Sequence, residues 1–586
     1  MSSSFSVPPD RDGTNTSELF FEDAESFNVS ACSYLGEGSR IVILIENIRD
    51  TNYYDRSTAI FTAGYFFYLI NEFTDRNVMI IDAYDWLHRT GANPPDDSSN
   101  PLYKACEHDK YGPMPFGYEA TFAHEYSHLL MNYVGYKEKW VDEGLAEYAV
   151  SVVGFTNTSS DPADPAFNSH LKTFLGYDAY RYGGPEQSLT RWEEQGSQEQ
   201  LSDYGSAYSF FLYLEGQLGT QVLNDFRNDP EAAGLEGLQS VLDLNGINTT
   251  VPELLKDWTV AVAVAGEITD GALVNGEAIN QSHPFAIPRI PLSKINWTNP
   301  QCYDKPGVPT NGADFIRMRK EKRKAYLSAD DISSIEFIGS KFYPTRPPEW
   351  IETNSSALYS GSGDLLDRSL VRQIEVPVTG EISLELEWDI EFGYDFFFVQ
   401  VYDEQESKWV TLESQNTTYD IVDVIPSFYP SLPGLTGSSD GEILEQTYQA
   451  EEYAGKTVYI ALRYCTDYGV SNNGVTLYGL TLDDSIVWDA TSLSSWQSMT
   501  EVFPIPVDWH ISLVSYTPGG NSVWAKHLPL DGNQVTLNDR ATLEENIGSD
   551  ASIVAALVMA IDMSESVFEF PTYELYVNGI LQPGGE

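Results

Sequence analysis

The stretch from Ala123 to Ala149, AHEYSHLLMNYVGYKEKWVDEGLAEYA, constrains the fold of this chain more than any other segment. It places two of the chain's eight histidines four residues apart, at His124 and His128. Because residues four apart lie on one face of an α-helix, both imidazoles can reach a single metal ion. Glu125 lies about 100° further around that helix, where its carboxylate can take a proton from water beside the metal. This spacing predicts a catalytic zinc site of the HExxH type.

A zinc site that keeps one position open for water needs a third protein ligand. The arrangement HExxHxxGxxH is excluded, because Met131 and Val134 stand where its glycine and last histidine would be. The segment WVDEGLAEYA offers Glu143 instead, on a second predicted helix that follows a turn at Gly135. If this second helix folds back antiparallel to the first, Glu143 faces both histidines and completes the ligand set.

Glu147 lies four residues after Glu143, on the same helix face. Its carboxylate can accept the second ring N–H of a ligand histidine, with His124 as the expected partner, and thereby fix the tautomer. A solvated surface charge is the alternative interpretation of Glu147. Asp142 is expected to point elsewhere on this helix and receives no role.

The combination of HEYSH with WVDEGLAEYA resembles the gluzincin metallopeptidases, whose third zinc ligand is a glutamate on a downstream helix. Among these it is most similar to the hyicolysin-type peptidases, which usually have asparagine where this chain has Asp142. The resemblance implies a zincin-type catalytic domain that hydrolyses peptide bonds. It implies zinc on His124, His128 and Glu143, with Glu125 as the general base.

The same resemblance implies a hydrogen-bond donor for the oxyanion of the reacting carbonyl. DYGSAYSFFLYLEGQLG (203–219) is similar to the segment that carries a tyrosine donor in aminopeptidase N-like gluzincins. It puts Tyr204 in that role, with Tyr208 as the reserve candidate and core packing as the alternative for both. The GxMEN signature of those exopeptidases is absent, and GPMPFG (112–117) echoes it only faintly, which favours an endopeptidase.

The pattern of elements predicts an α+β multidomain protein with four segments. Residues 1–270 are expected to form the metallopeptidase domain, and the Pro-rich residues 271–310 a linker or wrapping segment. Alternating strands, expected at 381–390, 394–403 and 456–464 among others, predict a β-sandwich or jelly roll at 311–490 and a small C-terminal β-sandwich at 491–586. In the first segment, strands are expected at 40–48 and 77–84 and helices at 57–74, 118–134, 140–153, 203–219 and 251–266.

Two stretches of the third segment, 386–413 and 453–484, resemble the β-sandwich region of secreted metallopeptidases of the immune inhibitor A type. The chain departs from that family at the active site, so the resemblance implies the accessory domain only. Clustered carboxylates suit a structural calcium ion, and solvated turn charges are the alternative. The candidate calcium ligands are Glu391, Asp395, Asp483 and Asp484.

The net charge of −54 excludes nucleic acid as a partner, because phosphate binding requires patches of lysine and arginine. No run of apolar residues is long enough for a membrane span, and MSSSFSVPPD has neither the basic start nor the apolar middle of a signal peptide. The four cysteines form no CxxC pair, which leaves disulfides or buried thiols at Cys32, Cys106, Cys302 and Cys465.

These observations predict a monomeric, extracellular zinc endopeptidase that acts on proteins or peptides, with its signal peptide already removed. A cell-surface adhesin or binding protein with a degenerate peptidase domain is the alternative from another class. The complete set of His124, His128, Glu143 and Glu125 argues against degeneration. A metal-dependent hydrolase of non-peptide substrates is the third reading, and it rests on analogy of fold alone.

Overall fold

The computed structural model describes residues 7–11, 13, 40–55, 61–97, 113–135, 137–178, 183–192, 199–268, 271–279, 283–299, 306–321, 324–354, 356–422, 426–467, 469–483, 485–488 and 492–585. The chain forms two compact units. The larger unit comprises Met1–Gly339, Trp509–Met563 and Tyr573–Glu586. The smaller unit comprises Ser340–Asp508 and Ser564–Thr572.

The larger unit begins with a three-stranded sheet in the order β1 (Ile41–Glu46), β3 (Asn77–Asp82), β2 (Gly64–Tyr65). β1 runs parallel to β3, whereas β2 is antiparallel to it. The two strands expected at 40–48 and 77–84 are therefore confirmed, and every residue of β3 is buried. The helix expected at 57–74 is wrong over residues 61–67, which are not helical, and α2 (Tyr68–Thr74) forms its last part. Residues 57–60 lie outside the described residues. Gly64 instead pairs with Ile81, where a Cβ would lie 2.8 Å from the carbonyl oxygen of Ile80.

A layer of helices follows this sheet. The helices expected at 118–134, 140–153, 203–219 and 251–266 are confirmed, with ends that differ by a few residues. α11 begins with a capping box, in which the side chain of Thr250 accepts from the backbone of Glu253 and the side chain of Glu253 accepts in return. Besides α2, the described helices of this unit that precede residue 265 are, in chain order, α1 (Thr51–Tyr54), α3 (Trp86–Arg89), α4 (Gly117–Met131), α5 (Lys139–Val153), α6 (Ser169–Phe174), α8 (Gln200–Leu218), α9 (Thr220–Asn228), α10 (Gly234–Leu244) and α11 (Val251–Val264).

Close packing between helices positions the candidate site. α4 packs on β3 through Leu129 and Leu130, which lie in one apolar cluster with Met79. α5 packs on both α4 and α8. Gly144 of α5 lets α8 approach closely, because a Cβ there would lie 2.5 Å from the ring of Phe211. The main apolar core fills the space among α5, α6, α8 and α11.

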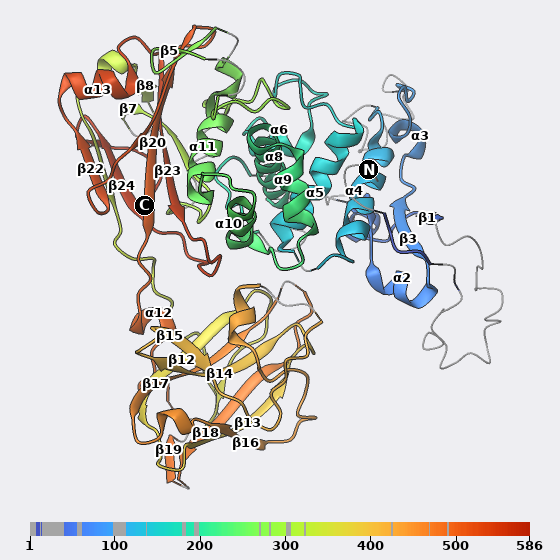
Figure 1. The fold of residues 1–586 in the computed structure, drawn as a ribbon, viewed down its shortest axis with the longest axis vertical. Coiled ribbons are helices and arrows are strands. Elements are labelled where there is room, and N and C mark those ends of the chain that lie inside the picture. The colour runs from blue at the N-terminus through green and yellow to red at the C-terminus, as the bar shows by residue number, and fades with distance from the viewer. Residues whose placement is uncertain are drawn as a thin grey trace. The chain divides into compact units, whose positions relative to one another are not determined.

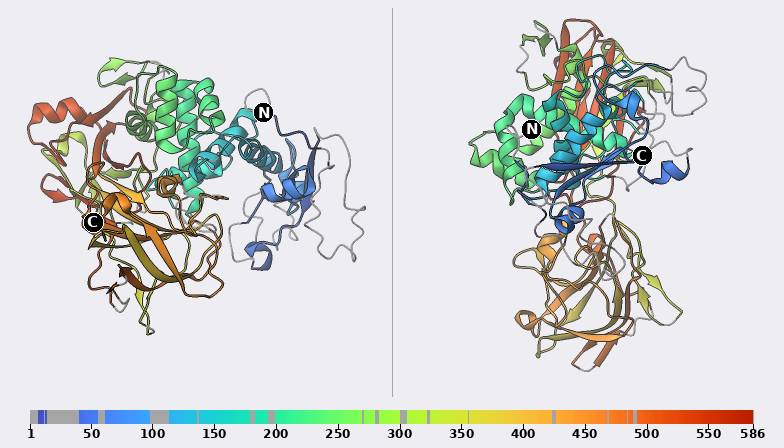
Figure 2. Two further views of the ribbon diagram at one scale, coloured as in Figure 1. Left: turned by 60° about the horizontal axis from the view of Figure 1, so that its bottom comes forward. Right: turned by 90° about the vertical axis from the view of Figure 1, so that its right-hand side faces the viewer.

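Two further sheets complete the larger unit. One has the order β5 (Glu277–Ala278), β4 (Leu273–Val274), β21 (Ser522–Leu528), β20 (Asp508–Tyr516), β23 (Ile553–Ile561), β6 (Asp314–Arg317). The other has the order β22 (Gln534–Leu537), β9 (Ile335–Gly339), β24 (Tyr573–Val577), β25 (Ile580–Leu581), with α13 (Arg540–Ile547) and the hairpin β7 (Arg319–Glu321), β8 (Lys324–Tyr326) beside them. α11 contacts β21 and β23, so the helical layer lies between the N-terminal and C-terminal sheets of this unit (Figures 1 and 2).

The four predicted segments do not coincide with the two units. Residues 491–586 form no sandwich of their own, because their strands pair with strands from the middle of the chain. β23 pairs with β6, β24 with β9, and β21 with β4. Residues 311–339 therefore belong with the helices rather than with the following sandwich. In the Pro-rich segment, Phe285, Ile290 and Trp297 are buried in the main core, as expected of a wrapping segment.

The smaller unit is a sandwich of two antiparallel sheets. The strands expected at 381–390, 394–403 and 456–464 are confirmed as β13 (Glu381–Asp389), β14 (Phe396–Asp403) and β17 (Thr457–Cys465). Their alternating apolar side chains meet in one core between the sheets. The first sheet has the order β10 (Ile351–Glu352), β11 (Leu358–Tyr359), β18 (Gly474–Leu482), β13, β16 (Leu444–Gln449), with β19 (Ser485–Trp488) on β18. The second has the order β12 (Asp367–Glu375), β17, β14, β15 (Lys408–Thr411), and α12 (Met499–Val502) lies near the end of this unit.

The structure also bears on the predictions about membrane spans and cysteines. Among the described residues, no helix has both the length and the apolar character needed to cross a membrane. Cys465 is a buried free thiol, and burial raises its pKa. The other three cysteines lie outside the described residues.

Candidate metal centre

Three side chains from α4 and α5 converge on one point. The Nε2 atoms of His124 and His128 are 3.0 Å apart. Oε2 of Glu143 lies 3.1 Å from Nε2 of His124 and 3.4 Å from Nε2 of His128. Among the described residues, these three form the single group whose ligand atoms all lie within 4.8 Å of one another.

The donor set and its spacing fit a zinc ion. Two imidazoles and one carboxylate form a typical catalytic ligand set, with bonds of about 2.0–2.1 Å. Tetrahedral ligands at that distance lie about 3.3 Å apart, which matches the three separations of His124, His128 and Glu143. These side chains are 14–16% exposed, so the group is accessible from solvent while remaining largely enclosed.

A carboxylate stands behind each of the two histidines. Oε1 of Glu147 lies 3.4 Å from Nδ1 of His124, which agrees with the orienting contact expected from the sequence. Oδ2 of Asp142 lies 2.9 Å from Nδ1 of His128, although off the direction of a hydrogen bond. A carboxylate that accepts the Nδ1 proton of a metal-binding histidine holds it in one tautomer and increases its basicity, and both carboxylates lie close enough to make such a contact.

The position of Asp142 corrects the sequence analysis, which assigned this residue no role. Asp142 precedes Glu143 on α5, and the antiparallel approach of α4 turns it toward the second histidine. The sequence held a hint of this contact. Glu147 follows Glu143 on α5 and reaches His124, so a carboxylate that precedes Glu143 could be expected to reach His128.

The electrostatics of this group favour bound positive charge. Burial alone would lower the pKa of His124 and His128, but the surrounding carboxylates outweigh it and raise both pKa values. Burial would likewise raise the pKa of Glu143 and Glu147, but the histidines outweigh it. The pKa of Glu143 lies well below its usual value and that of Glu147 at about 2. The carboxylates are thus ionised at neutral pH and available to stabilise a cation.

Glu125 differs from these carboxylates. It is 7% exposed, and its Oε2 accepts a hydrogen bond of 2.8 Å from the backbone N–H of Phe66. Phe66 directly follows β2, so the edge of the N-terminal sheet orients this side chain. Burial raises the pKa of Glu125, despite the opposing effect of His124 and His128. A carboxylate with a raised pKa beside a metal group can accept and return a proton.

The two candidate tyrosines on α8 occupy different environments. The ring of Tyr204 lies 6.2 Å from that of His124, centroid to centroid. Burial, followed by the charge of Glu143, raises its pKa. The ring of Tyr208 is completely buried, and its hydroxyl bonds with Ser151. Tyr204 therefore adjoins the metal group, whereas Tyr208 belongs to the packing of α5 against α8.

Sequence reasoning missed one histidine of this region. His170 of α6 lies with its Nδ1 3.0 Å from Oε1 of Glu147 and stacks its ring on Tyr204. No motif includes His170, because α6 reaches the group only through its tertiary packing on α8.

The predicted calcium ligands are not all gathered at one place. In the pairing of β13 with β18, Ile382 faces Leu482 at one end and Asp389 faces Gly474 at the other. Asp483 therefore lies at the opposite end of the sheet from Glu391 and Asp395, and its Oδ1 accepts from Thr379. Asp484 lies outside the described residues. The grouping of these four residues is therefore wrong. Glu391 follows β13 and Asp483 follows β18, and because these two strands are antiparallel, the residues that follow them lie at opposite ends of the sheet.

Asp395 has a different acidic neighbour, Asp467. The side chain of Asp395 is completely buried, and its Oδ1 accepts a hydrogen bond of 3.0 Å from the backbone N–H of Asp467. Its Oδ2 accepts no hydrogen bond of normal geometry among the described residues. Burial, together with the charges of Asp467 and Glu391, raises the pKa of Asp395 to about 7. A buried carboxylate without a partner among like charges destabilises the fold unless it takes up a proton or binds a cation.

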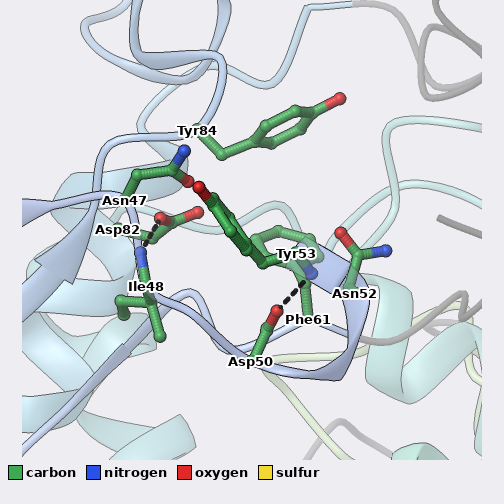
Figure 3. A pocket seen from close by; sticks show the side chains of 8 residues that line it. All are labelled: Asn47, Ile48, Asp50, Asn52, Tyr53, Phe61, Asp82 and Tyr84. Atoms are coloured by element: carbon green, nitrogen blue, oxygen red, sulfur yellow. Dashed lines mark hydrogen bonds between the residues drawn. The ribbon is translucent and has the colours of Figure 1, made fainter. Parts of the chain in front are cut away.

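A separate small hollow lies at the ends of β1 and β3 (Figure 3). Its two carboxylates already serve the backbone: Asp82 accepts from the N–H of Ile48, and Asp50 accepts from the N–H groups of Tyr53 and Thr62. None of the predicted site residues lines this hollow. Its lining consists of Asn47, Ile48, Asp50, Asn52, Tyr53, Phe61, Asp82 and Tyr84.

Comparison with known proteins adds one finding. Residues 348–488 match the family model described as immune inhibitor A-like, MAM domain. The match covers the sandwich of the smaller unit and agrees with the resemblance noted in its sequence. No curated protein matches the chain.

Proposed function

We propose that this chain is a zinc-dependent endopeptidase, with zinc held by His124, His128 and Glu143. The observation that carries the proposal is the convergence of three ligand atoms at separations of 3.0–3.4 Å, with Glu125 beside them. The carboxylates behind both histidines support it, because catalytic zinc sites orient their ligands in this way.

Zinc at this site would polarise the scissile carbonyl and lower the pKa of water toward neutrality. Glu125 would take the proton of the attacking water and return it to the leaving amine. The hydrogen bond from Phe66 to Oε2 fixes the orientation of Glu125, and the raised pKa of this carboxyl suits a group that must hold a proton briefly. The hydroxyl of Tyr204 would donate to the oxyanion of the substrate carbonyl.

The proposal also includes a role for the smaller unit and an extracellular location for the protein. The immune inhibitor A-like match at residues 348–488 supports an accessory role for the sandwich in a protease of the extracellular space. We also propose a structural calcium ion at Asp395. Its Oδ2, which has no hydrogen-bond partner among the described residues, supports this proposal, and backbone carbonyls and water would supply the remaining oxygen ligands.

The test compares the wild-type chain with Glu125→Gln. Glutamine keeps the size of the side chain but cannot accept the proton, so zinc content should stay at the wild-type level while cleavage of unfolded casein falls by about 10²–10⁴-fold. Glu236→Gln, an exposed change on α10, is the matched control and should leave both measurements unchanged.

Two results would count against the proposal. Wild-type protein that takes up no zinc would remove its basis, and Glu125→Gln that cleaves casein at the wild-type rate would remove the assigned general base. Zinc uptake without hydrolysis of any protein substrate would favour the alternative of a surface-binding protein with a degenerate peptidase domain.

A further inference from the structure

His170 stands where three helices of the larger unit meet. It belongs to α6, which packs against α8, and its side chain also reaches α5. Its side chain is 26% exposed, so its location is not explained by burial in an apolar core. Its two neighbours are both residues of the candidate metal centre, Glu147 and Tyr204.

The first contact is polar. Nδ1 of His170 lies 3.0 Å from Oε1 of Glu147. The same carboxylate oxygen lies 3.4 Å from Nδ1 of His124. An ionised carboxylate only accepts hydrogen bonds, so Nδ1 of His170 donates to this oxygen. When a metal replaces the proton on Nε2 of His124, the proton that remains on Nδ1 of His124 faces the same oxygen.

The second contact is a ring stack. The rings of His170 and Tyr204 lie 5.0 Å apart at 26°, and the ring of Trp192 meets that of Tyr204 edge-on at 4.9 Å. These two contacts restrict the tilt of the Tyr204 ring and so determine the direction of its hydroxyl.

The backbone around His170 is built for this approach. A Cβ at Gly205, the residue after Tyr204, would lie 2.2 Å from the carbonyl oxygen of His170, so the absence of a side chain there lets α6 touch α8. Asn168 caps α6 by accepting from the N–H of Leu171. The position of His170 is therefore set by packing and capping rather than by chance rotation of a surface side chain.

We infer that His170 is a positioning residue of the proposed metal centre, which it serves through two separate contacts. Its N–H holds Glu147 against His124 and thereby strengthens zinc binding, while its ring supports Tyr204 and thereby aligns the oxyanion donor. The inference rests on the proposed endopeptidase function.

Two variants separate these contacts. His170→Phe keeps a ring against Tyr204 but removes the N–H, so zinc should dissociate about tenfold faster, while kcat at saturating zinc stays within about twofold of wild type. His170→Asn keeps an N–H at the position of Nδ1 but removes the ring. It should retain zinc as the wild type does, while kcat falls about tenfold with KM unchanged. This loss is smaller than the 10²–10³-fold decrease in kcat caused by removing an oxyanion donor, because the hydroxyl of Tyr204 remains but is less well aligned.

His527→Phe is the matched control. His527 also contacts a carboxylate, Asp257, at 2.8 Å, and its side chain is 32% exposed, but its contacts lie outside the metal centre. Its zinc dissociation and kcat should equal those of wild type. The thermal midpoint of each zinc-free variant reports whether the fold itself has changed.

A double-mutant cycle tests the route to zinc. If His170 acts through Glu147, the change to Phe should add nothing to zinc dissociation once Glu147→Ala is present. Additive effects of the two changes would overturn the route. Equal zinc loss in the Phe and Asn variants, or no change in either, would overturn the inference while wild-type zinc binding and cleavage still uphold the proposed function. Wild-type protein without zinc would overturn both.

Discussion

Replacement of Asp395 by Asn should remove a pH-dependent destabilisation of the smaller unit. The side chain of Asp395 has no exposed surface, and burial together with the charges of Asp467 and Glu391 raises its pKa from 3.8 to about 7. Below pH 4 the carboxyl is protonated in the folded and unfolded chain alike. Between pH 4 and 7 the folded chain retains a proton that the unfolded chain has released, so stability falls as the pH rises through this range.

The magnitude follows from the size of the pKa difference. A rise from 3.8 to about 7 corresponds to about 4 kcal/mol in the free energy of unfolding at pH 8, as an upper bound. About 2.6 kcal/mol of this is lost between pH 5 and pH 8. For a unit of this size, 1 kcal/mol changes the thermal midpoint by about 2–4 °C, so the midpoints at the two pH values should differ by roughly 5–10 °C. Asparagine carries no charge at pH 5 or at pH 8, so Asp395→Asn should abolish this difference in stability between the two pH values.

Calorimetry of the full chain at pH 5 and pH 8, each with a chelator and with excess calcium, measures these effects. In chelator, the wild-type transition of the smaller unit should lie lower at pH 8, whereas that of Asp395→Asn should change far less. Calcium should raise the wild-type midpoint at pH 8 and leave the variant unchanged, because the ion compensates the buried charge. Asp483→Asn, at the other end of the sheet, should behave as wild type.

The reasoning is refuted if Asp395→Asn retains the wild-type difference between pH 5 and pH 8, because the buried carboxylate would then not be its source. An equal rise of both midpoints with calcium would place the ion elsewhere.

Two further changes test the metal centre. Tyr204→Phe should lower kcat by about 10²-fold with zinc content and KM unchanged, as measured by steady-state hydrolysis of a fluorogenic peptide; unaltered kcat would exclude the hydroxyl as an oxyanion donor. Asp142→Ala should weaken zinc binding by about tenfold, because it removes the carboxylate behind His128, and competition with a chromophoric chelator would detect this. Equal affinity in that assay would reduce Asp142 to a surface charge.

The helical spacing in the sequence was sufficient to predict the pair His124 and His128, because it depends only on the period of one helix. Glu143 was predictable because a turn and a second helix follow within a few residues. Residues that reach the candidate metal centre from helices distant in the sequence were not predictable in this way. His170 arrives through the contact of α6 with α8, which depends on the missing side chain of Gly205.

Strands were likewise predictable, but their partners were not. Alternation of apolar side chains identified β13, β14 and β17. It contained no information on pairing, so β23 was expected within a separate C-terminal domain although it pairs with β6. The same limit applies to the acidic cluster. Asp467 lies 72 residues after Asp395, and only the antiparallel pairing of β14 with β17 brings its backbone N–H to that carboxylate.

The sequence by itself determined the chemistry offered at each position: two imidazoles one helical turn apart, carboxylates at fixed offsets, and strands with one apolar face. These are properties of short stretches, and local backbone geometry is enough to define them. Only the tertiary structure decided which stretches meet, because contacts between helices and pairing between distant strands depend on how the whole core packs. The roles of Asp142, His170 and Asp467 follow from that packing and not from any local pattern.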